Sequence, residues 1–151
     1  MFPSEKTDEI PPTVGFNIKT LVSGRFKVNV WDVGGQKSIR SFWRNYFDTT
    51  DGLIWVVDSS DKHRLSDCKR VLGSVLGEER LSGATLLILA NKQDLPGSLS
   101  LEEIGQILEI DQIKQHRHCA IFACSIFSES SISAGMNWII NDIGNRMYSL
   151  R

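Results

Sequence analysis

The residues with the clearest capacity for chemistry form one short segment, Trp31-Asp32-Val33-Gly34-Gly35-Gln36. An alternating apolar run precedes it, so we expect the segment at the carboxyl end of a strand, where open α/β sheets bind ligands. There Asp32 could hold a hydrated Mg²⁺, Gly35 could present its backbone N–H to a terminal phosphate, and Gln36 could orient an attacking water. The same residues also fit an ordinary Gly-Gly turn after a strand.

A second segment, Asn91-Lys92-Gln93-Asp94, also follows an apolar run. Asp94 could accept two hydrogen bonds from the ring N–H and the exocyclic amine of guanine, a donor pair that adenine lacks. A site built on such bonds discriminates on the order of 10⁴-fold or more. The Lys92 stem could lie along the base, and Asn91 could tie the loop together. The alternative is a polar loop without a ligand.

Thr13 is a third candidate, because its hydroxyl could reach Mg²⁺ and its N–H the last phosphate of a nucleotide. A segment held in this way would order with a triphosphate and relax with a diphosphate. Thr13 also fits an ordinary threonine after two prolines. Three aromatic residues, Phe16, Trp31 and Tyr46, flank the candidate phosphate segments and could form an apolar patch for partner proteins, or pack within the hairpin and core.

The hydrophobic pattern predicts the elements that must position these residues. Alternating runs over 16–22 and 26–31 predict a β-hairpin. The rest of the chain predicts, in order, a buried strand over 52–58, a helix over about 62–79, a buried strand over 85–90, a short helix with a Ser100/Glu103 capping box, a buried strand over 119–124, and a closing helix carrying Met136 to Leu150. Strands alternating with helices indicate an α/β fold with a mostly parallel sheet, and 151 residues suggest a single domain over 1–151.

Composition excludes several classes of protein. Hydrophobic residues make up 41% of the chain and charged residues 23%, as in soluble globular proteins. A net charge of -1 lacks the excess of positive charge that is typical of nucleic-acid-binding proteins. No apolar run is long enough to span a membrane. Phe2 stands where N-myristoylation requires glycine, so we expect no myristoyl anchor.

The cysteines and histidines show no metal-binding spacing. Cys68, Cys119 and Cys124 form no C-x-x-C pair, and we expect reduced thiols in a cytoplasmic protein, with Cys119 and Cys124 in the core. The histidines His63, His116 and His118 fit no H-E-x-x-H pattern and are expected at the surface.

Four motifs give the chain a specific resemblance: Pro-Thr-Val-Gly-Phe-Asn over 12–17, Trp-Asp-Val-Gly-Gly-Gln over 31–36, Trp-Arg-Asn-Tyr-Phe over 43–47, and Asn-Lys-Gln-Asp-Leu-Pro over 91–96. Together they resemble the Arf family of small GTPases from about residue 12 to the end. The resemblance implies a P-loop GTPase fold with helices on both faces of the sheet. It also implies roles for individual residues: Mg²⁺ binding by Thr13 and Asp32, γ-phosphate binding by Gly35, water activation by Gln36, guanine binding by Asn91, Lys92 and Asp94 with Ser125 nearby, and an effector surface of Phe16, Trp31 and Tyr46.

By the same resemblance, the partners are a guanine nucleotide (GTP or GDP) and effector proteins such as tubulin-folding cofactors and carriers of lipidated proteins. The expected location is the cytoplasm, with a possible association with the cytoskeleton. Hydrolysis of GTP is expected to be slow without a partner.

The chain departs from the family pattern at its N-terminal end. The Walker A sequence G-x-x-x-x-G-K-[ST], which wraps the α- and β-phosphates, does not occur in it. The family's first strand and first helix are also missing, so the strands over 26–31 and 53–57 are expected to lack a neighbour on one side, and we expect an N-terminally incomplete GTPase domain. A smaller departure is Ser125-Ile126 where the family has Ser-Ala. The backbone N–H of Ile126 can still meet the guanine carbonyl, but its side chain is bulkier.

Three hypotheses follow. The first is an Arf-like GTP/GDP switch with slow hydrolysis. The second is a nucleotide-free interaction module that keeps part of the effector surface, which the missing Walker A sequence favours. The third is a chain that does not fold alone.

Overall fold

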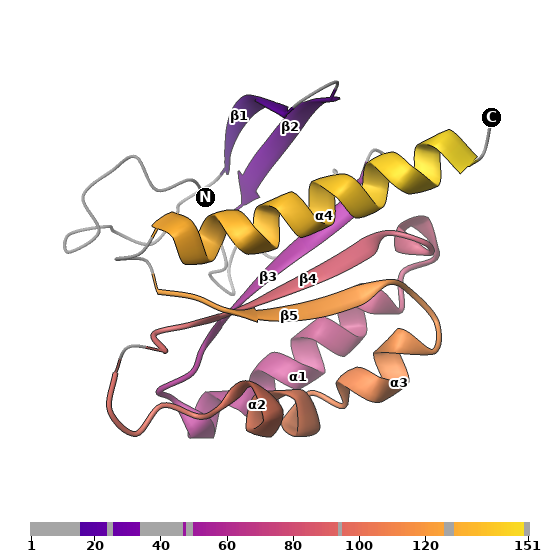
Figure 1. The fold of residues 1–151 in the computed structure, drawn as a ribbon. Coiled ribbons are helices and arrows are strands. Elements are labelled where there is room, and N and C mark those ends of the chain that lie inside the picture. Colours follow the sequence, from indigo (N-terminus) through magenta and orange to yellow (C-terminus); the bar gives the residue numbers. More distant parts are fainter. Residues whose placement is uncertain are drawn as a thin grey trace. The chain divides into compact units, whose positions relative to one another are not determined.

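The computed structural model describes residues 16–23, 26–33, 47, 50–93, 95–125 and 129–149. The chain falls into two compact units, 1–49 and 50–151, which are described separately. Figure 1 shows the helices and strands of both units as a ribbon.

The first unit contains the predicted hairpin. Strand β1 (Phe16–Ser23) pairs antiparallel with β2 (Phe26–Val33), with Phe16 opposite Val33 and Ser23 opposite Phe26. Only two residues of the sequence separate the strands, a common length for a hairpin connection.

The second unit is built on a parallel sheet in the order β3-β4-β5, made of β3 (Gly52–Asp58), β4 (Thr85–Asn91) and β5 (Cys119–Ala123). Each strand is one that the sequence predicts. Among the described strands, β3 pairs with β4 alone, as expected for the segment over 53–57.

Helices cover both faces of this sheet. Helices α1 (Lys62–Leu76), α2 (Leu101–Ile107) and α3 (Ile110–Lys114) lie against one face and α4 (Glu129–Ser149) lies against the other (Figure 1). The short 3-10 helix η2 (Glu79–Leu81) leads into β4.

The central strand β4 explains this arrangement, because its first six residues are all buried. Leu86, Ile88 and Ala90 belong to the core beneath α1, α2 and α3. Leu87 and Leu89 lie on the opposite face, next to Gly135 of α4. A strand with both faces covered reads as a continuous apolar run, which is why the pattern predicted it correctly.

Several boundaries differ from the sequence prediction: β1, β2 and β4 end one or two residues later than predicted, at Ser23, Val33 and Asn91. Helix α1 ends at Leu76 rather than near 79, because Gly77, a poor helix former, caps it. The short segment α3 was not predicted. Glu109 adopts a left-handed conformation (φ 55°) that ends one helix and starts the next, a backbone state that the apolar pattern does not encode. Strand β5 ends at Ala123, one residue before Cys124.

Other local predictions are confirmed. Ser100 accepts a hydrogen bond from the Glu103 N–H, and the Glu103 side chain accepts one from the Ser100 N–H, which completes the capping box. Cys119 and Cys124 are buried, free thiols. Leu150, the last residue of the predicted closing helix, lies outside the described residues.

A polar network fixes the amino-terminal ends of the strands to α4. The buried Thr85 hydroxyl donates to Asp142 Oδ2 at 2.6 Å, and His118 Nδ1 lies 2.8 Å from Asp142 Oδ1. Arg146 adds bonds to Asp142 (3.3 Å) and to the Asp51 carbonyl (3.1 Å). Burial raises the pKa of Asp142, but the hydrogen bonds from Thr85 and His118 and the nearby positive charges leave that pKa below its usual value.

Two of the helical glycines, Gly73 and Gly135, provide a matched test of the packing. A Cβ at Gly73 in α1 meets nothing within 4 Å, whereas one at Gly135 in α4 lies 2.9 Å from Leu89 Cδ2. We expect Gly73→Ala to raise the free energy of unfolding by about 0.5–1 kcal/mol, because alanine favours the helix. In Gly135→Ala, overpacking of about 1–3 kcal/mol should cancel or exceed that gain. Urea denaturation measures both variants, and an equal rise in stability would contradict the packing described for α4.

Candidate functional site

Three loops meet at the carboxyl edge of the β3-β4-β5 sheet. The parallel register places Asp58, the last residue of β3, beside Asn91, the last residue of β4. The Ser59 N–H donates to the Asn91 carbonyl at 3.1 Å, and the Gln93 N–H donates to the Cys124 carbonyl, just after β5, at 3.3 Å. These bonds join the loop after β4, which carries the candidate guanine-binding residues, to the loops on both sides of it.

Lys92 occupies a backbone state that non-glycine residues rarely adopt, with φ at 64°. Its carbonyl accepts hydrogen bonds from Ser98 Oγ at 2.6 Å and from the Leu95 N–H at 3.1 Å. Its ammonium lies 2.8 Å from Asp58 Oδ2. Contacts at both ends of the residue therefore hold a conformation that costs on the order of 1–2 kcal/mol.

The Asp58 carboxylate is held from a second direction. Asp58 Oδ1 accepts hydrogen bonds from the Ser60 N–H at 2.9 Å and from the Ser60 hydroxyl at 2.6 Å. Burial raises the pKa of Asp58, but the hydrogen bonds from Lys92 and Ser60 and the Lys92 charge outweigh it and leave the pKa below its usual value. Asp58 is therefore an anion at neutral pH and a fixed partner for Lys92.

Asn91 lies next to the loop after β5. The Cys124 thiol lies 3.8 Å from Asn91 Oδ1, to which it donates a weak hydrogen bond. Burial raises the pKa of Cys124, so the thiol keeps its proton at neutral pH. Ser125 follows Cys124 directly and is partly buried. The structure thus brings Asn91, Lys92 and Ser125 to one edge, as the sequence analysis expects of guanine-binding residues.

The other predicted site residues are placed less fully. Phe16 lies in β1, and Trp31 and Asp32 lie in β2. The backbone register sets Asp32 opposite Asn17 and Trp31 opposite Ile18. The remaining predicted residues lie outside the described part of the chain: Thr13, Gly35, Gln36, Tyr46, Asp94 and Ile126.

Sequence reasoning assigned no role at this edge to Asp58, Ser59 or Gln93. Ser59 is fully buried, and the Gln93 side chain donates to its hydroxyl at 2.7 Å. The available signal was the position of Asp58 and Ser59 directly after a buried strand, where polar residues face the ligand edge of a parallel sheet. Their pairing with residues 34 positions away is not visible in the sequence.

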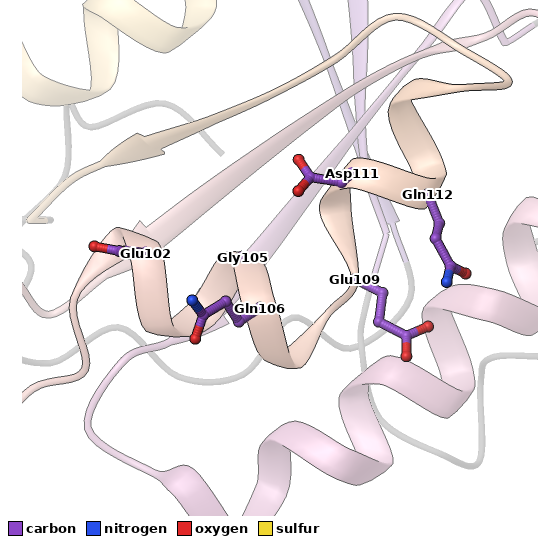
Figure 2. Close-up of a pocket in the computed structure, with 6 residues that line it drawn as sticks. All are labelled: Glu102, Gly105, Gln106, Glu109, Asp111 and Gln112. Carbon is purple, nitrogen blue, oxygen red and sulfur yellow. The ribbon is translucent and has the colours of Figure 1, made fainter.

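A hollow of about 510 Å³ lies along α2 and α3, away from these residues in the chain (Figure 2). It is lined by Glu102, Gly105, Gln106, Glu109, Asp111 and Gln112. The three carboxylates in this lining would repel the phosphates of a nucleotide, so the hollow is not a candidate nucleotide site.

The described residues were also compared with the expectations about metal sites and membrane-spanning segments. Histidines His63, His116 and His118 are exposed, as predicted. Within the described residues, no three histidine, cysteine or acidic side chains gather as metal ligands would. None of the described helices combines the length and hydrophobicity needed to cross a bilayer.

Comparison with known proteins gives a consistent result. The sequence model of the ADP-ribosylation factor family matches residues 1–143. ADP-ribosylation factor-like protein 2 of Arabidopsis thaliana is 53% identical over 146 residues, which cover 97% of this chain and 79% of that protein. The protein of the same name from Drosophila melanogaster is 52% identical over 149 residues, covering 99% of this chain and 80% of its own length.

A solved structure agrees with the sequence comparisons. The chain is similar to the Arl6 BBS3 small GTPase from Trypanosoma brucei, determined with the bound nucleotide analogue GppNp. The TM-score is 0.82 at 31% sequence identity, and the match covers 93% of this chain and 86% of the other.

The Asp58–Lys92 pair should contribute to stability in a pH-dependent way. Because the pKa of folded Asp58 is below its unfolded value, the contribution is present above about pH 4 and is lost as the pH falls through the folded pKa. A double-mutant cycle with Asp58→Asn and Lys92→Met, measured by urea denaturation, isolates the pair. Both side chains are more than a third exposed, so we expect a coupling of about 0.2–1 kcal/mol at pH 7. Coupling that stayed constant down to about pH 3 would contradict this account.

Proposed function

Because the chain belongs to the ADP-ribosylation factor family of small GTP-binding switch proteins, we propose that it binds a guanine nucleotide at the carboxyl edge of β4 and β5 and alternates between GTP- and GDP-bound states. The observation that carries the proposal is the set of bonds that hold Asn91 and Lys92 at one sheet edge and join their loop to Cys124, the residue before Ser125. Open α/β sheets bind ligands at that edge.

The base would be contacted by Asn91, Lys92, Asp94 and Ser125, with the N–H of Ile126 directed at the guanine carbonyl. Asp94 would accept from the two adjacent donors of guanine. Lys92 is suited to lie along the base, because Asp58 holds its ammonium and its apolar stem remains partly exposed.

The phosphate end would depend on residues of the other unit. Gly35 would donate its N–H to the γ-phosphate, and Gln36 would orient the water in a slow hydrolysis reaction. Carboxylate and hydroxyl oxygens are the donors that Mg²⁺ prefers, which supports Asp32 and Thr13 as ligands of a nucleotide-bound Mg²⁺. In this proposal residues 1–151 belong to a single GTP-binding domain.

The aromatic residues Phe16, Trp31 and Tyr46 would form the effector surface. From the motif resemblance described above, we propose tubulin-folding cofactors and carriers of lipidated proteins as effectors, and the cytoplasm, with association with the cytoskeleton, as the place of action.

A second candidate function is a nucleotide-free interaction module. The specific observation in its favour is that no G-x-x-x-x-G-K-[ST] sequence occurs in these 151 residues. Such a loop supplies most of the phosphate contacts in P-loop GTPases. The module would keep the hairpin and its aromatic residues as a binding surface for partners.

Nucleotide content separates the two functions. We expect the chain, purified with Mg²⁺ and shown by circular dichroism to be folded, to release about one guanine nucleotide per chain on denaturation. Chromatography of the released base is the measurement. Folded protein without nucleotide would refute the switch and leave the interaction module.

Base recognition by Asp94 has its own test. Xanthine carries a carbonyl where guanine carries its exocyclic amine, so an asparagine amide matches xanthine as a carboxylate matches guanine. We expect Asp94→Asn to lose at least about 10²-fold in affinity for GDP and to gain affinity for xanthosine diphosphate, measured by competition with a fluorescent nucleotide. As a matched control, Asp111→Asn on α3 should leave both affinities unchanged. Unaltered GDP binding by Asp94→Asn would remove Asp94 from the site.

A further inference from the structure

The side chain of Gln93 joins the loop after β4 to two other segments. Its Nε2 donates to Ser59 Oγ at 2.7 Å and to the Leu99 carbonyl at 2.9 Å. Ser59 belongs to the loop after β3, and Leu99 precedes α2. One amide group therefore ties together the connections that follow β3 and β4.

The orientation of this amide is determined by its partners. A carbonyl oxygen such as that of Leu99 only accepts hydrogen bonds, so the NH₂ group of Gln93 must face it. Both donors of that NH₂ group are then used, one for each partner. A carboxylate at this position would place one of its oxygens against the Leu99 carbonyl oxygen, with no hydrogen between the two acceptors.

Ser59 makes the arrangement rigid. It is fully buried, and each of its polar groups is engaged. Its N–H donates to the Asn91 carbonyl at 3.1 Å, its hydroxyl accepts from Gln93, and its carbonyl accepts from the Leu99 N–H at 2.8 Å. We name the set Ser59, Gln93 and Leu99 the loop clamp.

The clamp includes a residue of the segment that would contact the base. Gln93 lies in the chain between Lys92, with its left-handed backbone, and Asp94. A backbone state that costs free energy persists only where its surroundings fix it. The Gln93 side chain is anchored to buried Ser59 in the loop after β3, so it restrains the backbone next to the left-handed Lys92.

We propose that Gln93 is a positioning residue for guanine selectivity: through the loop clamp it holds Lys92 and Asp94 in the geometry that distinguishes guanine from other purines. This inference rests on the guanine site proposed above and assigns the selectivity to a residue that does not itself touch the base.

The test compares GDP with inosine diphosphate, which lacks only the exocyclic amine that Asp94 would bind. The hydrogen bond from the exocyclic amine to the charged Asp94 carboxylate would give the wild type about a tenfold or greater preference for GDP over inosine diphosphate. We expect Gln93→Met, close to glutamine in length but without its hydrogen bonds, to lower that preference about tenfold. The matched control, Gln106→Met on the exposed face of α2, should leave the preference unchanged.

A merely structural role would give a different result. General weakening of the fold would reduce the affinities for both nucleotides together and leave their ratio as in the wild type. Ser59→Ala should reproduce the loss of selectivity, and the double variant should lose little more than either single one, because both remove the same bond.

Hydrogen exchange supplies a readout without nucleotide. We expect the Ser59 and Leu99 amides to exchange faster in folded Gln93→Met than in the wild type. If the wild type binds GDP, either of two results would overturn the positioning role alone. One is unchanged amide exchange in Gln93→Met, and the other is an unchanged ratio of its affinities for GDP and inosine diphosphate. A folded wild type that binds neither nucleotide would overturn the guanine site and this inference together.

Discussion

The parallel pairing of β4 with β3 and β5 is the constraint on which the second unit depends. Backbone N–H and C=O groups buried on both faces of a sheet must be paired within it, because no water reaches them. The first six residues of β4 are buried, and both of its edges are bonded to neighbouring strands. The positions of the helices on the two faces and of the loops at the two edges follow from this strand.

The two edges of the sheet carry different kinds of polar interaction. At the amino-terminal edge, charged and hydroxyl groups around Asp142 fix the long helix α4 to the starts of the strands. Near it, the Arg117 guanidinium donates to three backbone carbonyls, those of Leu76, Leu81 and Ala84. At the carboxyl edge, the bonds instead join loops to one another and hold a left-handed residue. Stability is concentrated at one edge and candidate chemistry at the other, as is usual where parallel strands end in ligand-binding loops.

Family membership and local geometry support the function in different ways. The comparisons place the chain in the ADP-ribosylation factor family, with residues 1–143 matched by the family model. The geometry adds a reason why Asn91 and Lys92 are held in place. The carbonyls of both residues accept hydrogen bonds, and the Lys92 ammonium pairs with Asp58. A preorganised loop spends less binding free energy on ordering.

The sequence by itself determined the features that depend on near neighbours. Five consecutive apolar residues were enough to predict β4, and Ser100 with Glu103 predicted a capping box, because burial on both faces and helix capping are local patterns. The proposal that Asn91, Lys92 and Asp94 contact the base also came from the sequence, since it depends on side-chain donors and acceptors at fixed spacing. Only the tertiary structure decided that Gln93 bonds to Ser59, 34 residues away, and that Arg117 reaches carbonyls 33 to 41 residues away. It also decided that Glu109 turns left-handed between α2 and α3. These contacts depend on which loops the parallel register brings to the same edge, and hydrophobic periodicity carries no information about that.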